Sequence, residues 1–453
     1  MTGPLPLTDG RFVVPGNRWD LLAAEPSRAV RVGVVIPHYE QPAQLALVLR
    51  ALELQDYASD LIEVVVADDG SANAPDVTGA ALNVRAVRQE DRGFRAAAAR
   101  NLGAAATTAD VLCFLDADTV PEPGYLRHLV RLPSLLPDAL VVARRRHADL
   151  TGLSPAALED WWAGRIRPEI LPEPGWLVDA YAASADLLHA DLASYRHVIS
   201  AVMCCSRELF DEVGGFDESF REYGGEDWEF AHRAMAGGAV LHHARDAVAW
   251  HDGPDWGDRP VAERAAGKNR EALAMARLIP DPAARRFGLR YDVPAACVEI
   301  DTASHGAGSL VTTMAGFLGE DVGIWLTGPA AAGLLDELGL QDPRVHAGPV
   351  PDALARRCRF VVRTTGRPLL PDGSFAELLR RCGEPGVGEV RTVGAAAGVV
   401  VQATWAVSRR RRWTNGHVRL RDSTQAAGLS ATLTVAADSI GLVDVEPDAD
   451  LSW

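Results

Sequence analysis

The strongest constraint on the fold is a series of short apolar runs that alternate with helical patterns over the first 120 residues. The runs are rich in Val and Ile without a polar alternation, which is typical of strands buried on both faces. Between them, apolar residues recur at helical spacing. The predicted elements are strand 31–37, helix 42–56, strand 61–71, strand 83–89, helix 93–108 and strand 110–120. This order predicts an α/β fold with a mostly parallel sheet and flanking helices.

The later chain predicts a second α/β domain. Residues 1–30 are punctuated by Pro and Gly and indicate an N-terminal arm, before a first domain at 31–285 and a C-terminal domain at 286–453. The second domain repeats the order strand, loop, helix, strand, and its residues 358–382 parallel residues 113–132, which indicates a weak internal repeat. Arg363, Thr364 and Thr365 stand where the first copy has acids. We therefore expect no metal site in the second copy.

Composition restricts the function classes. The 453 residues carry a net charge of −16, which argues against a binder of nucleic acid or anionic membranes. Six cysteines without a C-x-x-C pair indicate buried thiols in a reducing compartment. Neither a secretory signal nor a run of about 20 apolar residues is evident. We expect a soluble cytoplasmic protein, and peripheral association with a membrane stays open.

Acidic residues stand at the ends of two of the predicted strands. Asp68 and Asp69 end one strand, and Asp116 and Asp118 end another. Ligands of such sheets bind beyond the carboxyl ends of the strands, so these acids are expected to converge. Asp116-Ala117-Asp118 is a candidate for a divalent cation that grips a diphosphate, with a polar strand end as the alternative. Asp68-Asp69-Gly-Ser would accept hydrogen bonds from a base and a ribose, or form a ligand-free Asx turn.

Further candidates lie around this centre. Arg95 and Arg100 would contact phosphate or hold an Asp in place, and Tyr39 would stack on a base or stay an exposed loop residue. Glu226 and Asp227 follow two glycines at a predicted helix start, where a carboxylate would act as general base or simply cap the helix. His251 closes a short strand and would complete a metal's ligand set, with His242 and His243 as rivals.

The order of motifs over residues 31–255 resembles the family 2 glycosyltransferases of the GT-A fold. The matching segments are VVIPHYE, VVVADDGS, GFRAAAARNLG, FLDADTVPEPGYL, GGFDESFREYGGEDWEFAHR and the closing WH. The last segments look particularly like the branch of chondroitin polymerases and galactosyl- and N-acetylgalactosaminyltransferases. Tyr223 departs from that branch, which has Trp there, and this puts the acceptor sugar in doubt. The resemblance implies a GT-A domain, a Rossmann-like mixed sheet with flanking helices. The C-terminal region has no matching acidic motif, and from the weak internal repeat we expect there an α/β domain that is a degenerate GT-A-like copy.

The resemblance also implies roles and partners. It assigns the nucleotide to Pro37, Tyr39, Asp68 and Asp69, the metal to Asp118 and His251, and the base role to Asp227. Asp116 would serve the ribose or the metal's water shell. The expected reaction is inverting transfer from a UDP-sugar to a carbohydrate or glycoside hydroxyl with Mn²⁺ or Mg²⁺. The C-terminal domain would serve packing, acceptor binding or homodimerisation.

Two other functions fit the sequence less well than sugar transfer does. A sugar-nucleotide nucleotidyltransferase needs a Gly-rich loop with Lys or Arg after the first strand, but residues 38–44 read HYEQPAQ. The other rival is a non-catalytic scaffold that binds a glycan or nucleotide, derived from a transferase, with the C-terminal domain as its working part. Such a scaffold would not need the acids, yet Asp116, Asp118, Asp227 and His251 are all present. The sequence therefore favours an enzyme.

Overall fold

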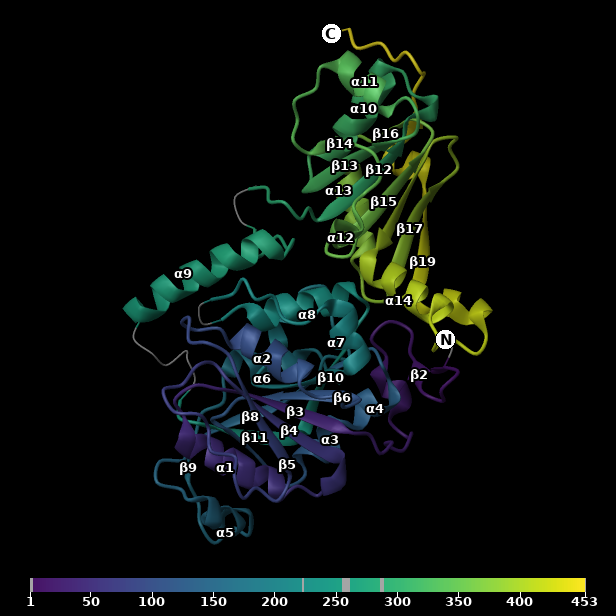
Figure 1. Cartoon of the computed structure of the whole chain (residues 1–453). Helices are drawn as coiled ribbons and strands as arrows, with labels where there is room; N and C mark the ends of the chain where they lie inside the picture. The colour runs from purple at the N-terminus through teal and green to yellow at the C-terminus, as the bar shows by residue number, and fades with distance from the viewer. Residues whose placement is uncertain (1–2, 222–223, 255–260, 286–288, 453) are drawn as a thin grey trace. The chain divides into compact units, whose positions relative to one another are not determined.

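The computed structural model divides the chain into two compact units, and it describes residues 3–221, 224–254, 261–285 and 289–452. The first unit comprises residues 3–235 and 239–275, and the second comprises residues 236–238 and 276–452. The boundary falls inside a long helix. The two units are coloured from purple to teal and from green to yellow in Figure 1.

The first unit is built on a nine-stranded mixed sheet. Its strands are β3 (Val32–His38), β4 (Ile62–Asp68), β5 (Asn83–Arg88), β6 (Val111–Leu115), β7 (Thr119–Pro121), β8 (Ala139–Asp149), β9 (Glu169–Leu171), β10 (Val202–Ser206) and β11 (Val240–Asp252). A separate pair is formed by β1 (Leu5–Pro6) and β2 (Phe12–Val13). The helices are α1 (Pro42–Glu53), α2 (Ala96–Ala105), α3 (Tyr125–Leu129), α4 (Arg131–Leu135), α5 (Leu158–Trp162), α6 (Gly175–Ala183), α7 (Arg207–Val213), α8 (Glu226–Ala236) and α9 (Val261–Leu278).

The strand order in this sheet is β5-β4-β3-β6-β10-β8-β11-β7, with β9 beside β8. Strands β3 to β6 are parallel, and β10 runs antiparallel between β6 and β8. Figure 1 shows α1 and α2 on opposite sides of the sheet. Helix α2 approaches closely because Gly103 has no side chain: a Cβ there would lie 2.4 Å from Val35 Cγ1. The predicted α/β fold is therefore confirmed, and it carries the candidate acids to one edge of the sheet.

The predicted strand 110–120 is wrong in one respect that matters for the site. Strand β6 ends at Leu115, and the backbone turns before β7 begins at Thr119. The N–H of Thr119 donates to the carbonyl of Asp116 over 3.1 Å, which closes a turn around Ala117. Asp116 and Asp118 thus lie in a turn rather than on one face of a strand. A turn changes the chain direction, so strand alternation does not set the directions of the two carboxylates.

The second unit repeats the topology of the first. Its sheet contains β12 (Ala296–Asp301), β13 (Val322–Thr327), β14 (Val345–Ala347), β15 (Phe360–Thr365), β17 (Val387–Val393), β18 (Gly398–Ala403) and β19 (Ala431–Ala436). Its order β14-β13-β12-β15-β18-β17-β19 matches the first sheet's order from β5 to β11, strand for strand. The parallel and antiparallel pairings also agree throughout. This shared topology is what the internal repeat predicts.

The remaining elements of the second unit complete its layers. A small pair is formed by β16 (Pro368–Leu369) and β20 (Val443–Asp444). The helices are α10 (Ala307–Leu318), α11 (Ala331–Leu338), α12 (Asp352–Ala355), α13 (Ser374–Cys382) and α14 (Thr404–Asn415). Where the first sheet leads into Asp116 and Asp118, β15 ends in Arg363, Thr364 and Thr365. The acids are therefore a feature of the first unit.

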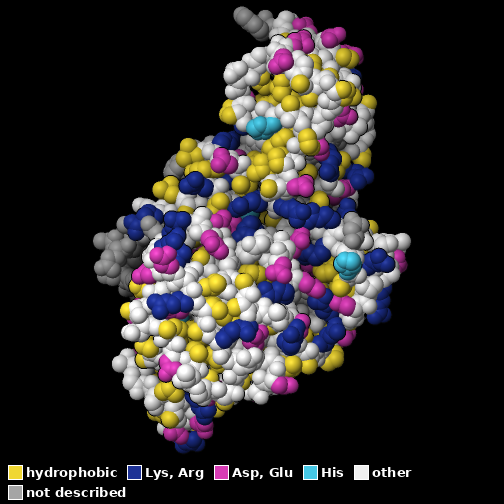
Figure 2. All heavy atoms as spheres, viewed as in Figure 1, with side chains coloured by type: hydrophobic (Ala, Val, Ile, Leu, Met, Phe, Trp, Pro, Cys, Tyr) yellow, Lys and Arg dark blue, Asp and Glu magenta, His cyan; other side chains and the backbone are white. Residues whose placement is uncertain are grey.

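Two general expectations can be compared with the structure. All six cysteines are free, buried thiols, as predicted. None of the helices in the described ranges is both long and apolar enough to cross a bilayer. Figure 2 shows basic and acidic side chains interspersed over much of the visible face.

Candidate active site

A cavity of about 950 Å³ opens in the first unit beyond the carboxyl ends of β3, β4 and β6. Its volume is at the upper end of the range for small-molecule sites. The polar side chains of its wall come from many segments that are far apart in the sequence. The lining includes Pro37, His38, Tyr39, Gln41, Asp69, Phe94, Arg100, Asp116, Ala117, Asp118, Arg145, Trp176, Ser200, Gly224, Gly225, Glu226, Asp227, Trp228, Lys268 and Glu271. The fold thus brings most of the predicted site residues together.

Asp118 and His251 form the first pair of interest. His251 Nε2 lies 3.7 Å from Asp118 Oδ2, and Gln41 Nε2 donates to the same oxygen over 3.3 Å. The pair is held by β11 beside β7, because His251 is opposite Thr119 in the register. Burial raises the pKa of Asp118, Asp116 adds to the rise, and His251 opposes it. A carboxylate in this position is stabilised by added positive charge.

Arg100 joins two parts of the site. Its guanidinium is 4% exposed, and it donates from Nη2 to Asp116 Oδ1 and from Nη1 to Glu226 Oε1, each over 2.9 Å. Burial disfavours the charge, but Asp116 and Glu226 outweigh it and raise the pKa of Arg100 above its ordinary value. The sequence left two roles open for Arg100, contact with a phosphate or the holding of an Asp. The hydrogen bond to Asp116 corresponds to the second role. Its guanidinium is engaged by carboxylates.

Asp227 lies next to this bridge at the first turn of α8. The N–H of Trp228 donates to Asp227 Oδ1 over 2.8 Å. Burial raises the pKa of Asp227 to about 7, the adjacent Glu226 carboxylate adds to the rise, and Arg100 opposes it. A carboxylate with a pKa near neutrality suits general base catalysis, because it can accept a proton and still be deprotonated at working pH.

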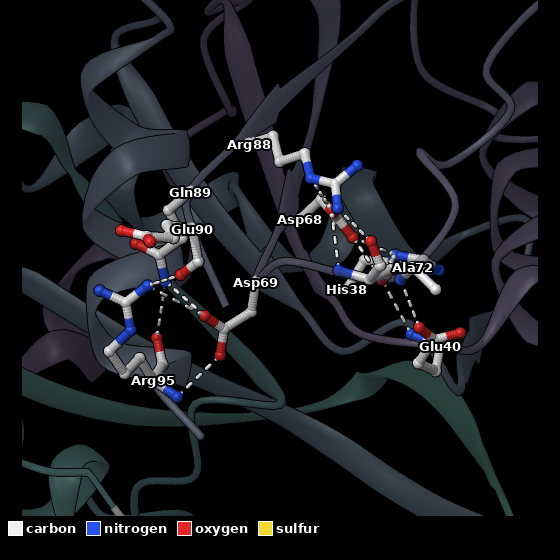
Figure 3. Close-up of polar contacts among 10 residues, drawn as sticks. His38, Glu40, Asp68, Asp69, Ala72, Arg88, Gln89, Glu90 and Arg95 are labelled. Carbon is white, nitrogen blue, oxygen red and sulfur yellow. Dashed lines mark hydrogen bonds and ion pairs between the residues drawn. The ribbon is translucent and has the colours of Figure 1, made fainter. Parts of the chain in front are cut away.

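The adjacent Asp68 and Asp69 have different surroundings, as Figure 3 shows. Asp68 is fully buried and lies outside the described lining of the cavity. Its oxygens accept from Ser71 Oγ over 2.5 Å and contact His38 Nδ1 at 3.0 Å and Arg88 Nε at 3.2 Å. Asp69 lines the cavity and accepts from the N–H of Arg95 over 2.7 Å. The structure therefore gives Asp69 access to a ligand and gives Asp68 a structural network.

The remaining predicted nucleotide contacts fall into two groups. Pro37 and Tyr39 line the cavity, and the ring of Tyr39 is half exposed. Arg95 lies outside the described lining, and its side chain donates to the carbonyl of Glu90. Tyr223, where the sequence departs from the resembled branch, lies outside the described residues.

Several residues of the cavity wall were not predicted from the sequence. Arg145 comes from β8, Trp176 from α6, and Lys268 and Glu271 from α9. They are far from the acidic motifs in the chain, and none stands in a recognisable spacing. Trp228, directly after Asp227, carried the one available signal: a large aromatic side chain at the start of a polar helix.

The residues around Asp118 fit a divalent cation in type. Among the described residues no three side chains of His, Cys, Asp or Glu are grouped closely enough to form a metal site alone. Asp118 Oδ2 and His251 Nε2 nevertheless approach the same point, and the other ring nitrogen of His251 lies 3.3 Å from the carbonyl of Gly253. That contact leaves Nε2 for a metal. One oxygen and one imidazole donor leave coordination positions for a diphosphate and water.

Two segments of the chain match models of known protein families. Residues 33–189 match the model of glycosyl transferase family 2. Over these residues the chain is similar to family 2 glycosyltransferases. Residues 181–245 match a second model, described as the N-terminal domain of galactosyltransferase. The family 2 match contains Asp69, Arg100, Asp116 and Asp118, the second match contains Asp227, and His251 and α9 follow both.

Three curated relatives of the family 2 domain are themselves named as synthases or glycosyltransferases. Chondroitin synthase of Escherichia coli is 28% identical over 298 residues, which cover 61% of this chain and 43% of the relative. Hyaluronan synthase of Pasteurella multocida is 27% identical, with 61% and 30% covered. Validoxylamine A glucosyltransferase of Streptomyces hygroscopicus subsp. limoneus is 30% identical, with 54% of each chain covered. The chain thus spans less than half the length of the first two.

Proposed function

We propose that the protein transfers a sugar from a UDP-sugar to a hydroxyl of a saccharide or glycoside acceptor, with inversion at the anomeric carbon. The observation that carries this proposal is the presence of Asp227 in the same cavity as Asp116 and Asp118. Arg100 joins Asp116 to Glu226, the residue directly before Asp227. The reaction needs a site for an anionic leaving group and a base on the other side of the sugar. The two groups of carboxylates provide one site each.

In this proposal Pro37, Tyr39 and Asp69 hold the nucleoside. Tyr39 offers a half-exposed ring for the base, and Asp69 offers a carboxylate for a ribose hydroxyl. Asp118 and His251 would hold Mn²⁺ or Mg²⁺, which when bound neutralises charge on the departing diphosphate. Asp227 accepts the proton of the acceptor hydroxyl as that oxygen attacks. Glu226, fixed by Arg100, keeps the start of α8 in place.

Transfer should depend on a divalent cation. We expect EDTA to abolish sugar transfer from a UDP-sugar panel to a chondroitin oligosaccharide or a glucoside, and Mn²⁺ to restore it. Asp118→Asn should weaken Mn²⁺-dependent UDP binding by calorimetry, because it removes the charge that attracts the cation. The anomeric configuration of the product, read by NMR, tests inversion. Full activity in EDTA would contradict the metal assignment.

Asp68→Ala and Asp69→Ala should separate stability from nucleotide binding. We expect Asp68→Ala to lower the free energy of unfolding in urea by about 3–5 kcal/mol, because it leaves His38, Ser71 and Arg88 without a buried partner. Asp69→Ala should cost about 1–3 kcal/mol, the effect of losing hydrogen bonds to a carboxylate, yet weaken UDP binding more. The reverse ranking of the two variants in either measurement would contradict these roles.

The alternative of a non-catalytic binding scaffold can be tested directly. A scaffold that binds glycans would have no need for metal-dependent UDP binding. Calorimetry with UDP, with and without Mn²⁺, therefore separates it from an enzyme. An absence of UDP binding under both conditions would remove the proposed transfer reaction.

A further inference from the structure

Lys268 is the single lysine among the 453 residues; all other basic residues among the 45 Lys and Arg are arginines. It belongs to α9, beyond both family matches, and lines the cavity that contains Asp227. Its side chain is 52% exposed, so a ligand can reach the ammonium group. A lysine in an otherwise arginine-only chain points to a need for its compact ammonium, which rotates freely and presents three donors.

Glu271 fixes Lys268 in place. Lys268 Nζ donates to Glu271 Oε2 over 2.6 Å, and the Glu271 side chain is only 6% exposed. Glu271 in turn packs on the turn before α8. A Cβ on Gly224 would lie 3.0 Å from Glu271 Oε2, and one on Gly225 would lie 3.3 Å from Glu271 Cγ. Both glycines have φ above +90°, which other residues rarely adopt. Because neither glycine has a side chain, Glu271 of α9 can pack closely against the turn that precedes Asp227.

Two tryptophans complete this part of the wall. Trp228 has Lys268 Nζ 5.9 Å from its ring centroid, and its ring lies edge-to-face with Trp176, at 6.3 Å between centroids. Trp176 is 49% exposed. We call Trp176, Trp228, Lys268 and Glu271 the α9 wall. Aromatic rings pack against the apolar face of a pyranose, and an ammonium–carboxylate pair donates to and accepts from its hydroxyls.

The α9 wall lies beside the start of α8, where Asp227 is found. Asp116 and Glu226 accept hydrogen bonds from different nitrogens of Arg100. Asp227 and Trp228 come directly after Glu226 in α8, and Lys268 Nζ lies 5.9 Å from the ring centroid of Trp228. The α9 wall therefore adjoins the base rather than the Asp118–His251 pair. Its charges largely balance, because Lys268 neutralises Glu271. A neutral polyhydroxylated ring fits this combination better than a diphosphate does.

We propose that the α9 wall is the binding site for the terminal sugar ring of the acceptor, with the Lys268–Glu271 pair bonded to its hydroxyls. This inference rests on the proposed function and adds to it the residues that bind the acceptor, none of which belongs to the acidic motifs. Glu271 acts as a positioning residue for Lys268. Trp176 and Trp228 supply the surface on which the ring packs.

The single lysine makes a sharp test available. In a protein of these 453 residues an amine-reactive ester acylates Lys268 and the α-amino group, and the α-amino group serves as the internal reference in peptide mass spectrometry. We expect a chondroitin oligosaccharide or a p-nitrophenyl glycoside, added with UDP and Mg²⁺, to slow acylation of Lys268. UDP and Mg²⁺ alone should leave its rate unchanged. Equal protection by UDP and Mg²⁺ alone would place Lys268 at the donor and overturn the proposal, as would an absence of protection by any saccharide.

Kinetics of variants supply a second readout. Lys268→Met and Glu271→Gln should raise the acceptor KM about tenfold, the effect of losing a hydrogen bond to a charged group, and leave the UDP-sugar KM nearly unchanged. Lys268→Arg should recover part of the loss. Asn269→Ala, an exposed neighbour on α9 outside the described lining, is the matched control and should behave as wild type. An unchanged acceptor KM in Lys268→Met overturns the proposal.

The experiment also separates this inference from the proposed function. If wild-type protein fails to bind UDP with Mg²⁺, the transferase proposal itself fails, whatever the labelling shows. If UDP binds and UDP-sugar is hydrolysed normally in Lys268→Met while transfer to the acceptor falls, the donor site and the α9 wall are both supported.

Discussion

Asp227→Asn should lower kcat for sugar transfer by about 10²- to 10⁴-fold, the usual contribution of a general base. The amide keeps the shape of the side chain and its hydrogen bond from the N–H of Trp228, but it does not take up the acceptor's proton. UDP binding with Mn²⁺ should be retained, because the Asp118–His251 pair is untouched. Initial-rate kinetics and calorimetry on the same preparation measure the two effects.

The pH dependence of the wild type checks the same assignment. Burial and Glu226 raise the pKa of Asp227 to about 7, and only the deprotonated form is a base. The rate kcat/KM should therefore rise with pH through about 7 and level off above it. In Asp227→Asn this step should disappear. Transfer at the wild-type rate in the variant, or a pH profile that is flat between 5 and 8 in the wild type, would contradict the base role.

Asp227→Asn should also change stability in a pH-dependent way. Because the folded-state pKa lies above the ordinary carboxyl value, the contribution of Asp227 to stability is present at low pH and is lost as pH rises toward about 7. The variant should therefore have a higher Tm than wild type at pH 8, and a smaller difference at pH 5. Thermal unfolding at the two pH values measures this. A Tm difference of opposite sign at pH 8 would show that Asp227 is stabilised in its charged form.

Arg100→Met should destabilise the fold strongly, with a loss of about 3–5 kcal/mol in the free energy of unfolding. The arginine is buried, and its removal leaves the carboxylates of Asp116 and Glu226 without their cation. Sugar transfer should fall as well, because both groups of site carboxylates lose a common support. Urea unfolding and transfer kinetics measure the two losses.

Two further variants make the Arg100 prediction specific. Arg95→Met changes a nearby arginine whose side chain donates to the carbonyl of Glu90 and forms only a long ion pair with Asp69, at 3.8 Å. It should cost less than about 1 kcal/mol. Adding Glu226→Gln to Arg100→Met should recover part of the lost stability, because one of the two uncompensated charges is removed. Additive losses in the double variant would mean that Arg100 and Glu226 do not interact.

Much of the fold was predictable because strand and helix patterns have different periods. The runs around Val34, Val65 and Phe114 became β3, β4 and β6, and the small residues around Gly103 became α2. The sequence also indicated a repeated arrangement, which the matching strand orders of the two sheets now support. The break between Leu115 and Thr119 was missed, because an apolar run gives no signal of where a turn begins when acids follow it.

The candidate site was predictable only where its residues belong to short motifs at the end of a strand or the start of a helix. Asp69, Asp116, Asp118 and Asp227 all line one cavity. Asp68 could not be separated from Asp69 by sequence, because the difference lies in which neighbours each side chain meets. His38 and Arg88 surround Asp68, whereas Asp69 opens to the cavity.

The sequence by itself determined the class of fold, the family of the domain and the acids at its centre, because hydrophobic period and short motifs are local properties of the chain. The tertiary structure alone decided which groups meet. It placed Arg100 between Asp116 and Glu226 and brought Lys268 and Glu271 of α9 against Gly224 and Gly225. These contacts join residues far apart in the chain, and contacts of that kind depend on packing, which no local pattern records.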